Sequence, residues 1–145
     1  LSDKTEVYIE KFTSNFEEII DPKVLGQLMT DKVIEFKPTQ FMRGSNYSNC
    51  VILADESQNF DGHELMTILT RLKKGKIILT GDKKQADIST RFVATEFLRE
   101  LLDGIPFTYY FEFSKEDNMR DPILIQIAER YEKMEAVGKI PRNKK

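Results

Sequence analysis

Two short apolar runs constrain this chain most, because each of them leads directly into polar and acidic residues. They are Cys50–Ala54 and Ile77–Leu79, and continuous apolar runs of this length are typical of strands buried in a parallel sheet. Between them, Asp61 and Glu64 have the spacing of a capping box at the start of a helix. This helix is expected to end at Gly75 and to bury Leu65, Ile68, Leu69 and Leu72. The pattern therefore predicts a strand–helix–strand unit with parallel strands.

The rest of the chain continues the alternation of helices and strands. Apolar residues at three- and four-residue steps predict helices over residues 5–20 and 90–103, and a last helix from Pro122 that buries Ile123, Leu124, Ile127, Ala128 and Tyr131. The first helix is expected to end at Asp21-Pro22. Strands are expected over Val33–Phe36 and Phe107–Phe113. Such an alternation favours an α/β fold with a mostly parallel sheet, in which ligands bind at the carboxyl ends of the strands.

The composition is ordinary for a soluble globular protein. A chain of 145 residues with 40% hydrophobic and 32% charged residues is expected to form a single domain over residues 1–145. No apolar run approaches the roughly 18 residues that a membrane span needs, and no signal peptide is visible. The single cysteine, Cys50, also favours a cytoplasmic location. A net charge of −2 gives no general indication of nucleic-acid binding.

The acidic pair Asp55-Glu56 follows the first of these strands without an intervening residue. An aspartate at a strand end can hold Mg²⁺ through the water shell of the ion, and the next carboxylate can orient an attacking water. Gln58 would then lie close enough to sense a phosphate. For an acidic pair considered alone, a polar turn after a strand is the favoured interpretation.

Two later segments have a similar character. The second strand ends in Thr80-Gly81-Asp82, and Gln85 follows shortly afterwards; an ordinary capped turn is the competing interpretation. Arg120 stands immediately before the last helix, which begins at Asp121-Pro122. An arginine beside a helix N-terminus is well placed to bind phosphate, although it is also a common surface residue.

Together, these segments resemble the PhoH-like family of P-loop ATPases, which are cytoplasmic proteins related to the motor domains of superfamily one helicases. The resemblance extends over about residues 33–132 and rests, in order, on Phe41–Gly44, Asp55–Asn59, Leu69–Leu72, Leu79–Asp82 with Gln85 and Asp87, Gly104–Phe107 and Arg120–Pro122. It implies a RecA-like α/β core that uses Mg²⁺ and ATP, handles RNA or DNA in a helicase-like manner and assembles into a ring-shaped homo-oligomer.

The resemblance also implies roles for individual residues of the nucleotide site. Asp55 would coordinate Mg²⁺ through water, Glu56 would activate the attacking water, and Gln58 would sense the nucleotide. Asp82 and Gln85 correspond to the motif that links the nucleotide state to nucleic acid.

Two arginines receive roles in the same way. Arg120 resembles the arginine that reaches the terminal phosphate, and Arg43 is a candidate contact for nucleic acid or for a neighbouring subunit. The chain departs from the family pattern at Ser57, where alanine is usual, and at Ser45, where a further arginine is usual. It departs also at Asp121, where histidine is common, and this change places a negative charge beside Arg120.

A phosphate-binding loop is missing from this pattern. Such a loop has the form G-x-x-x-x-G-K-[ST], in which backbone N–H groups surround the phosphates. The pairs Gly75-Lys76 and Gly138-Lys139 lack both the earlier glycine and the following hydroxyl residue. In the family this Walker A loop lies upstream, so we expect an incomplete, C-terminal portion of the ATPase domain that has no ATPase activity by itself.

Two other functions fit parts of the sequence. One is a binding or assembly domain that keeps the P-loop fold but does not hydrolyse ATP, because the phosphate loop is truly absent. A phosphate-loop motif upstream of Leu1 would separate that function from the ATPase. The other is a phospho-accepting signalling domain, which is disfavoured because its acidic pair belongs after the first strand.

Overall fold

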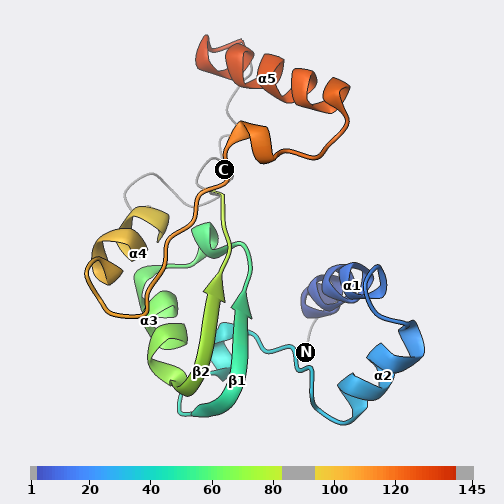
Figure 1. Ribbon diagram of the computed structural model, residues 1–145, viewed down its shortest axis with the longest axis vertical. Helices are drawn as coiled ribbons and strands as arrows, with labels where there is room; N and C mark the ends of the chain where they lie inside the picture. The colour runs from blue at the N-terminus through green and yellow to red at the C-terminus, as the bar shows by residue number, and fades with distance from the viewer. Residues whose placement is uncertain (1–2, 83–93, 140–145) are drawn as a thin grey trace. The chain divides into compact units, whose positions relative to one another are not determined.

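The computed structural model describes residues 3–82 and 94–139 (Figure 1). The chain comprises two compact units, residues 1–104 and residues 105–145, and the single domain expected over residues 1–145 stays a prediction. The first unit contains α1 (Asp3–Glu17), α2 (Pro22–Thr30), η1 (Thr39–Phe41), β1 (Tyr47–Ala54), η2 (Ser57–Asn59), α3 (Gly62–Arg71), β2 (Leu72–Leu79) and α4 (Ala94–Leu102). The second unit contains η4 (Lys115–Asp117) and α5 (Pro122–Ala136).

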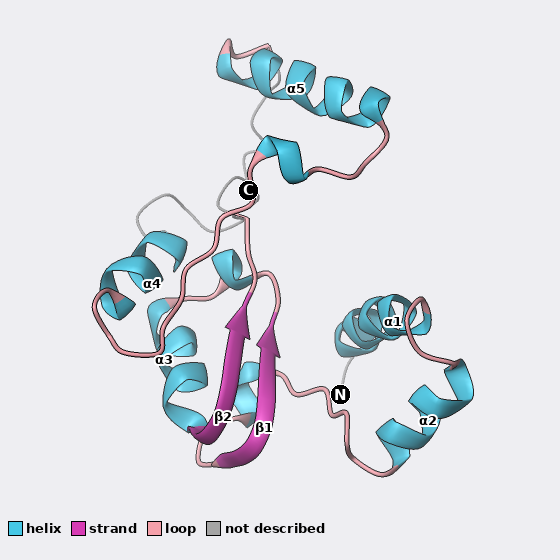
Figure 2. Ribbon diagram, viewed as in Figure 1, coloured by secondary structure: helices cyan, strands magenta, loops and turns pink. Residues whose placement is uncertain are grey.

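The first unit is built around β1, α3 and β2, as Figure 2 shows. The two strands are parallel, and their register pairs Ile52 with Ile77 and Ala54 with Leu79. Helix α3 begins with the predicted capping box: the Asp61 carboxylate accepts from the N–H of Glu64 at 2.8 Å, and the Glu64 carboxylate accepts from the N–H of Asp61 at 3.1 Å. The expectation of an α/β arrangement with parallel strands is therefore confirmed.

The core of this unit lies on one face of the strand pair. Leu65 and Ile68 of α3 are almost fully buried, and partly buried Ile52, Ile77 and Leu79 pack against the same clusters. The opposite face is open: Val51 is 55% exposed and Leu53 is 57% exposed. The prediction of strands buried on both faces is thus wrong for the described residues: side chains alternate between the two faces of a strand, and only the face toward α3 is packed.

The end of α3 also differs from the sequence expectation. The helix ends at Arg71, and the chain passes directly into β2, so that Leu72 and Gly75 belong to a strand. Gly75 has φ 145°, and a Cβ atom there would overlap the carbonyl oxygen of Cys50 on the paired strand. This glycine therefore allows the two backbones to approach, rather than ending a helix.

Two segments predicted to be strands have an irregular backbone. The first is Val33–Phe36, which follows α2. The N–H groups of Val33 and Ile34 both donate to the carbonyl of Leu28 in α2, the helix that begins at Asp21-Pro22. The N–H groups of this segment are thereby used to close the helix instead of pairing with a strand. Residues 107–113 are also irregular, and Phe107 has a positive φ of 66° and is 92% exposed.

Helix α5 has the predicted start, but its apolar stripe is not buried. The Asp121 carboxylate accepts from the N–H of Ile123 at 2.8 Å, and Pro122 occupies the first turn, as expected. Ile123, Leu124, Ile127 and Tyr131 are each more than half exposed. Among the described residues of the second unit, the only other regular element is the three-residue η4, so no longer helix or strand covers this stripe. None of the described helices combines the length and the apolar character needed to cross a membrane.

Candidate functional site

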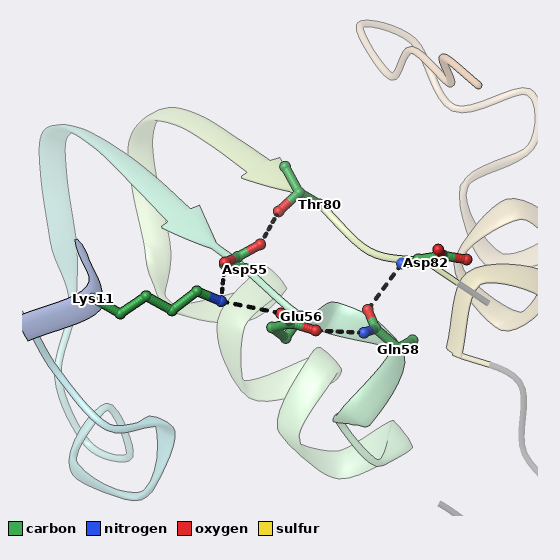
Figure 3. Close-up of polar contacts among 6 residues, drawn as sticks. All are labelled: Lys11, Asp55, Glu56, Gln58, Thr80 and Asp82. Atoms are coloured by element: carbon green, nitrogen blue, oxygen red, sulfur yellow. Dashed lines mark hydrogen bonds and ion pairs between the residues drawn. The ribbon is translucent and has the colours of Figure 1, made fainter. Parts of the chain in front are cut away.

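The candidate site lies at the carboxyl ends of β1 and β2, which are held side by side beyond the last paired residues. The N–H of Thr80 donates to the carbonyl of Ala54 at 2.9 Å, and the N–H of Ser57 donates to the carbonyl of Thr80 at 2.8 Å. These bonds bring Thr80 opposite Asp55, and the Thr80 hydroxyl donates to the Asp55 carboxylate at 2.6 Å (Figure 3). The parallel pairing thus orients the first acid of the pair.

Glu56 turns the chain sharply after Asp55. Its backbone is left-handed, with φ 55° and ψ 37°, a conformation that is uncommon for a residue with a side chain and that often marks a functional turn. The Gln58 amide nitrogen donates to Glu56 Oε2 at 2.6 Å. This short bond fixes the Glu56 carboxylate over the end of the sheet.

Gln58 connects the two loops of the site. Its side chain is only 4% exposed, and its amide oxygen accepts from the N–H of Asp82 at 3.0 Å, while its amide nitrogen donates to Glu56. Figure 3 shows this continuous path from Glu56 through Gln58 to the backbone of Asp82. A displacement of the second loop would therefore be transmitted to the Glu56 carboxylate.

Lys11 of α1 approaches the acidic pair. Its ammonium nitrogen lies 3.2 Å from Glu56 Oε1 and 3.9 Å from Asp55 Oδ2. The three side chains are 37–53% exposed, so this contact adds no more than about 1 kcal/mol to stability. The contact matters for chemistry, because it shows that both carboxylates lie within reach of a single cation.

The structure brings together four of the residues predicted from sequence, namely Asp55, Glu56, Gln58 and Asp82. Gln85 lies outside the described residues, and Arg120 belongs to the second unit. Arg43 lies in the first unit, just after η1, beside α3.

Lys11 was missed by sequence reasoning, whereas Thr80 and Gly81 were noted in the segment after the second strand but received no role of their own. The contact of Lys11 with the acids is tertiary and has no local signal in the sequence. Thr80 did have a signal, since it follows β2 directly, as Asp55 follows β1.

The fit of the site to a metal ion follows from its oxygen donors. Asp55 and Glu56 offer carboxylate oxygens, and the described residues contain no cluster of three or more histidine, cysteine, aspartate or glutamate side chains able to enclose a metal. Mg²⁺ usually keeps several waters and binds through one or two carboxylates together with phosphate oxygens. The donor set therefore fits a hydrated Mg²⁺ better than it fits a zinc ion enclosed by protein ligands.

Gly81 is the tightest backbone approach in the site, and its replacement should disturb the Gln58 bridge. A Cβ atom on Gly81 would lie 2.7 Å from both Gln58 Oε1 and Ser57 Oγ. Gly81→Ala should destabilise the chain by about 1–3 kcal/mol because the two buried side chains must move. Urea denaturation followed by circular dichroism would measure the change.

The same substitution at Gly26 is the matched control. A Cβ atom on Gly26 in α2 would meet no atom within 4 Å, so Gly26→Ala should stabilise the helix by about 0.5–1 kcal/mol. If the two substitutions changed the free energy of unfolding equally, the close packing around Gly81 would not contribute to stability.

Comparison with known proteins places the chain in a defined group. A family model described as PhoH-like protein matches residues 1–132. A PhoH-like protein of Synechocystis sp. is 33% identical over 141 residues, which covers 93% of this chain and 42% of that relative. PhoH-like proteins of Mycobacterium tuberculosis (30% identical over 142 residues, 95% and 40%) and Bacillus subtilis (29% over 135 residues, 92% and 42%) are similar. The chain thus spans about two fifths of the length of these relatives.

Proposed function

The chain belongs to the PhoH-like family, and from that premise we propose that it supplies the metal- and water-handling part of a site for Mg²⁺-dependent ATP hydrolysis. The observation that carries most weight is the buried Gln58 bridge, which joins the Glu56 carboxylate to the loop after the neighbouring strand. A polar turn without chemical function would not need to bury an amide between an acid and a second loop. The bridge supports a site in which the loops after β1 and β2 move together.

Asp55 is the residue proposed to hold Mg²⁺, through water. The Thr80 hydroxyl orients one of its oxygens, which leaves the other, Oδ2, for the hydrated ion. A bound Mg²⁺ would neutralise charge on the β- and γ-phosphates of ATP. The Lys11 ammonium near Oδ2 supports this assignment, because it already places a positive charge beside the carboxylate.

Glu56 is the residue proposed to accept a proton from the attacking water. One of its oxygens, Oε2, is occupied by the short bond from Gln58, so Oε1 is the atom proposed to face the water. Lys11 contacts Oε1 at 3.2 Å. In the active arrangement, Lys11 would therefore have to withdraw from Oε1 or share it with the water.

Gln58 and Asp82 are proposed to sense the nucleotide. A shift of the Asp82 backbone on binding or release of the terminal phosphate would change the hydrogen bond to Gln58 and, through it, the position of Glu56. Gln85 is proposed to extend this coupling toward nucleic acid. Arg120 is proposed to contact the terminal phosphate.

Several properties of the whole protein belong to the same proposal. The β1–α3–β2 unit would form part of a RecA-like core, and a phosphate-binding loop outside these residues would complete the site. ATP turnover would be coupled to the handling of RNA or DNA, in a ring-shaped homo-oligomer of the cytoplasm. The parallel strand pair and the family membership support this picture.

Asp55→Asn tests the metal assignment in a protein that contains the phosphate-binding loop. Removal of the carboxylate charge should reduce the Mg²⁺-dependent gain in ATP affinity by about tenfold, which corresponds to about 1.4 kcal/mol. Fluorescent ATP titrations with Mg²⁺ and with EDTA would measure the gain. Asp103→Asn is a suitable control, because Asp103 is also an exposed aspartate, just beyond α4.

Two results would contradict the proposal in different ways. If Asp55→Asn and Asp103→Asn gave the same Mg²⁺-dependent gain, Asp55 would not be the metal residue. If the complete protein bound ATP but showed no turnover under any condition, the non-hydrolysing binding or assembly domain would be the better description.

A further inference from the structure

A polar cavity lies along α3, and neither Asp55 nor Glu56 lines it. It has a volume of about 480 Å³ and is lined by five α3 residues, His63, Met66, Thr67, Thr70 and Arg71, together with Arg43 and Gly44 from the segment after η1. The α3 residues follow three- and four-residue steps, so they form one stripe on the helix. We refer to this cavity as the α3 groove.

The α3 groove is positively charged. Arg43 and Arg71 both line it, and none of the residues that line it is acidic. The ion pairs found among the described residues involve neither arginine. An anion in the groove would therefore meet two guanidinium groups that no described carboxylate already neutralises.

Arg71 has a donor that lacks a partner. Its Nε is buried and makes no hydrogen bond to a described residue, while its Nη2 lies 3.3 Å from the Thr70 hydroxyl. Leaving a buried donor unsatisfied costs about 1–3 kcal/mol. The position of Arg71 in the last turn of α3 explains why a positive charge is favourable there, but it does not explain an unsatisfied Nε.

We propose that the α3 groove binds phosphodiester groups of single-stranded nucleic acid. Arginine guanidinium groups donate in a fork that matches phosphate oxygens, and the stripe extends over about two helical turns, or roughly 11 Å, which is long enough for more than one phosphate. The Met66 side chain, 40% exposed, offers an apolar contact for a sugar or base. This inference rests on the coupling to nucleic acid proposed above, and it assigns that coupling to a defined surface.

The test measures binding of a fluorescein-labelled oligouridylate to the full-length protein by fluorescence anisotropy at several NaCl concentrations. Arg43→Ala is the primary variant, because Arg43 is exposed and its loss should leave folding intact. Affinity should fall about tenfold, and the slope of log affinity against log salt should decrease by about 1, as for the loss of one phosphate contact. Arg71→Lys keeps the charge but removes the fork, so affinity should fall by roughly threefold or more with little change in slope.

Lys23→Ala is the matched control, since it removes one exposed positive charge from α2. Equal losses of affinity in Lys23→Ala and Arg43→Ala would overturn the groove and indicate diffuse attraction. Competition by inorganic phosphate as strong as competition by unlabelled oligouridylate would also overturn it, since the groove would then be a site for a free anion.

Basal ATP turnover, measured in the same preparations, distinguishes this inference from the proposed function. Arg43→Ala should bind oligouridylate weakly while turnover in the absence of oligouridylate persists, because neither Asp55 nor Glu56 lines the α3 groove. Normal binding in Arg43→Ala with normal turnover would overturn the groove alone. Absence of oligouridylate binding to the unchanged protein would overturn both the groove and the proposed coupling, while turnover would still report on the ATPase site.

Discussion

Glu56→Gln is expected to reduce ATP turnover by about 100-fold or more in a protein that contains the phosphate-binding loop, which is the range of general-base catalysis. ATP binding should change little. The glutamine amide keeps the size of the side chain and retains an oxygen that can accept from Gln58, but it cannot take a proton from water. Steady-state phosphate release and a separate ATP titration would measure the two quantities.

Glu100→Gln is the matched control for this prediction. Glu100 is an exposed residue of α4, and its substitution removes the same charge outside the candidate site. If Glu56→Gln hydrolysed ATP at the same rate as Glu100→Gln, the short contact between Gln58 and Glu56 would be structural, and the base would have to be sought elsewhere.

The β1–α3–β2 unit was predictable because its signals are local. The capping box of Asp61 and Glu64 involves residues one helical turn apart, and the apolar strands differ sharply from the polar segments that follow them. The end of α3 was not predictable from the same residues. Gly75 is compatible with a helix end and with a close strand pair, and only the opposing carbonyl of Cys50 decides between them.

Alternating side chains alone did not make a strand. Residues 107–113 alternate, but the segment is irregular, and Phe111 packs edge-on against Phe113 at a centroid distance of 4.9 Å. A strand requires a partner for its backbone N–H and C=O groups, and the sequence pattern does not specify that partner. The same reasoning applies to the exposed stripe of α5, whose periodicity predicted a helix correctly but not its burial.

Part of the candidate site could be predicted from its residue order. Asp55, Glu56 and Gln58 are close in sequence, and parallel pairing necessarily brings the end of β2 beside them. The hydrogen bonds that join Gln58 to both loops depend on the left-handed backbone at Glu56, which no local sequence rule demanded. Lys11 reaches the acids from α1 by tertiary packing, so its contact became visible only in the structure.

Arg120→Ala is expected to lower kcat for ATP by about 1,000-fold in a protein that contains the phosphate-binding loop, with little change in ATP affinity. An arginine that meets the terminal phosphate stabilises charge that develops in the transition state, and such residues contribute at least about 10³-fold to the rate. Steady-state turnover over a range of ATP concentrations would separate kcat from KM. Arg130→Ala is the control, since Arg130 is an exposed arginine of α5.

Asp121 follows Arg120 directly and could pair with it in a purely structural role, but the second unit provides evidence against such a pair. The Asp121 carboxylate caps α5 by accepting from the N–H of Ile123, and the ion pairs among the described residues do not include Arg120. The N–H of Arg120 donates to Asn118 Oδ1 at 3.0 Å, which holds the backbone before the helix, and Arg120 is an exposed residue. If Arg120→Ala lowered the unfolding midpoint but kept normal turnover per folded molecule, this arginine would be structural after all. A loss of kcat at an unchanged midpoint would support the proposed action of its charge on the phosphate.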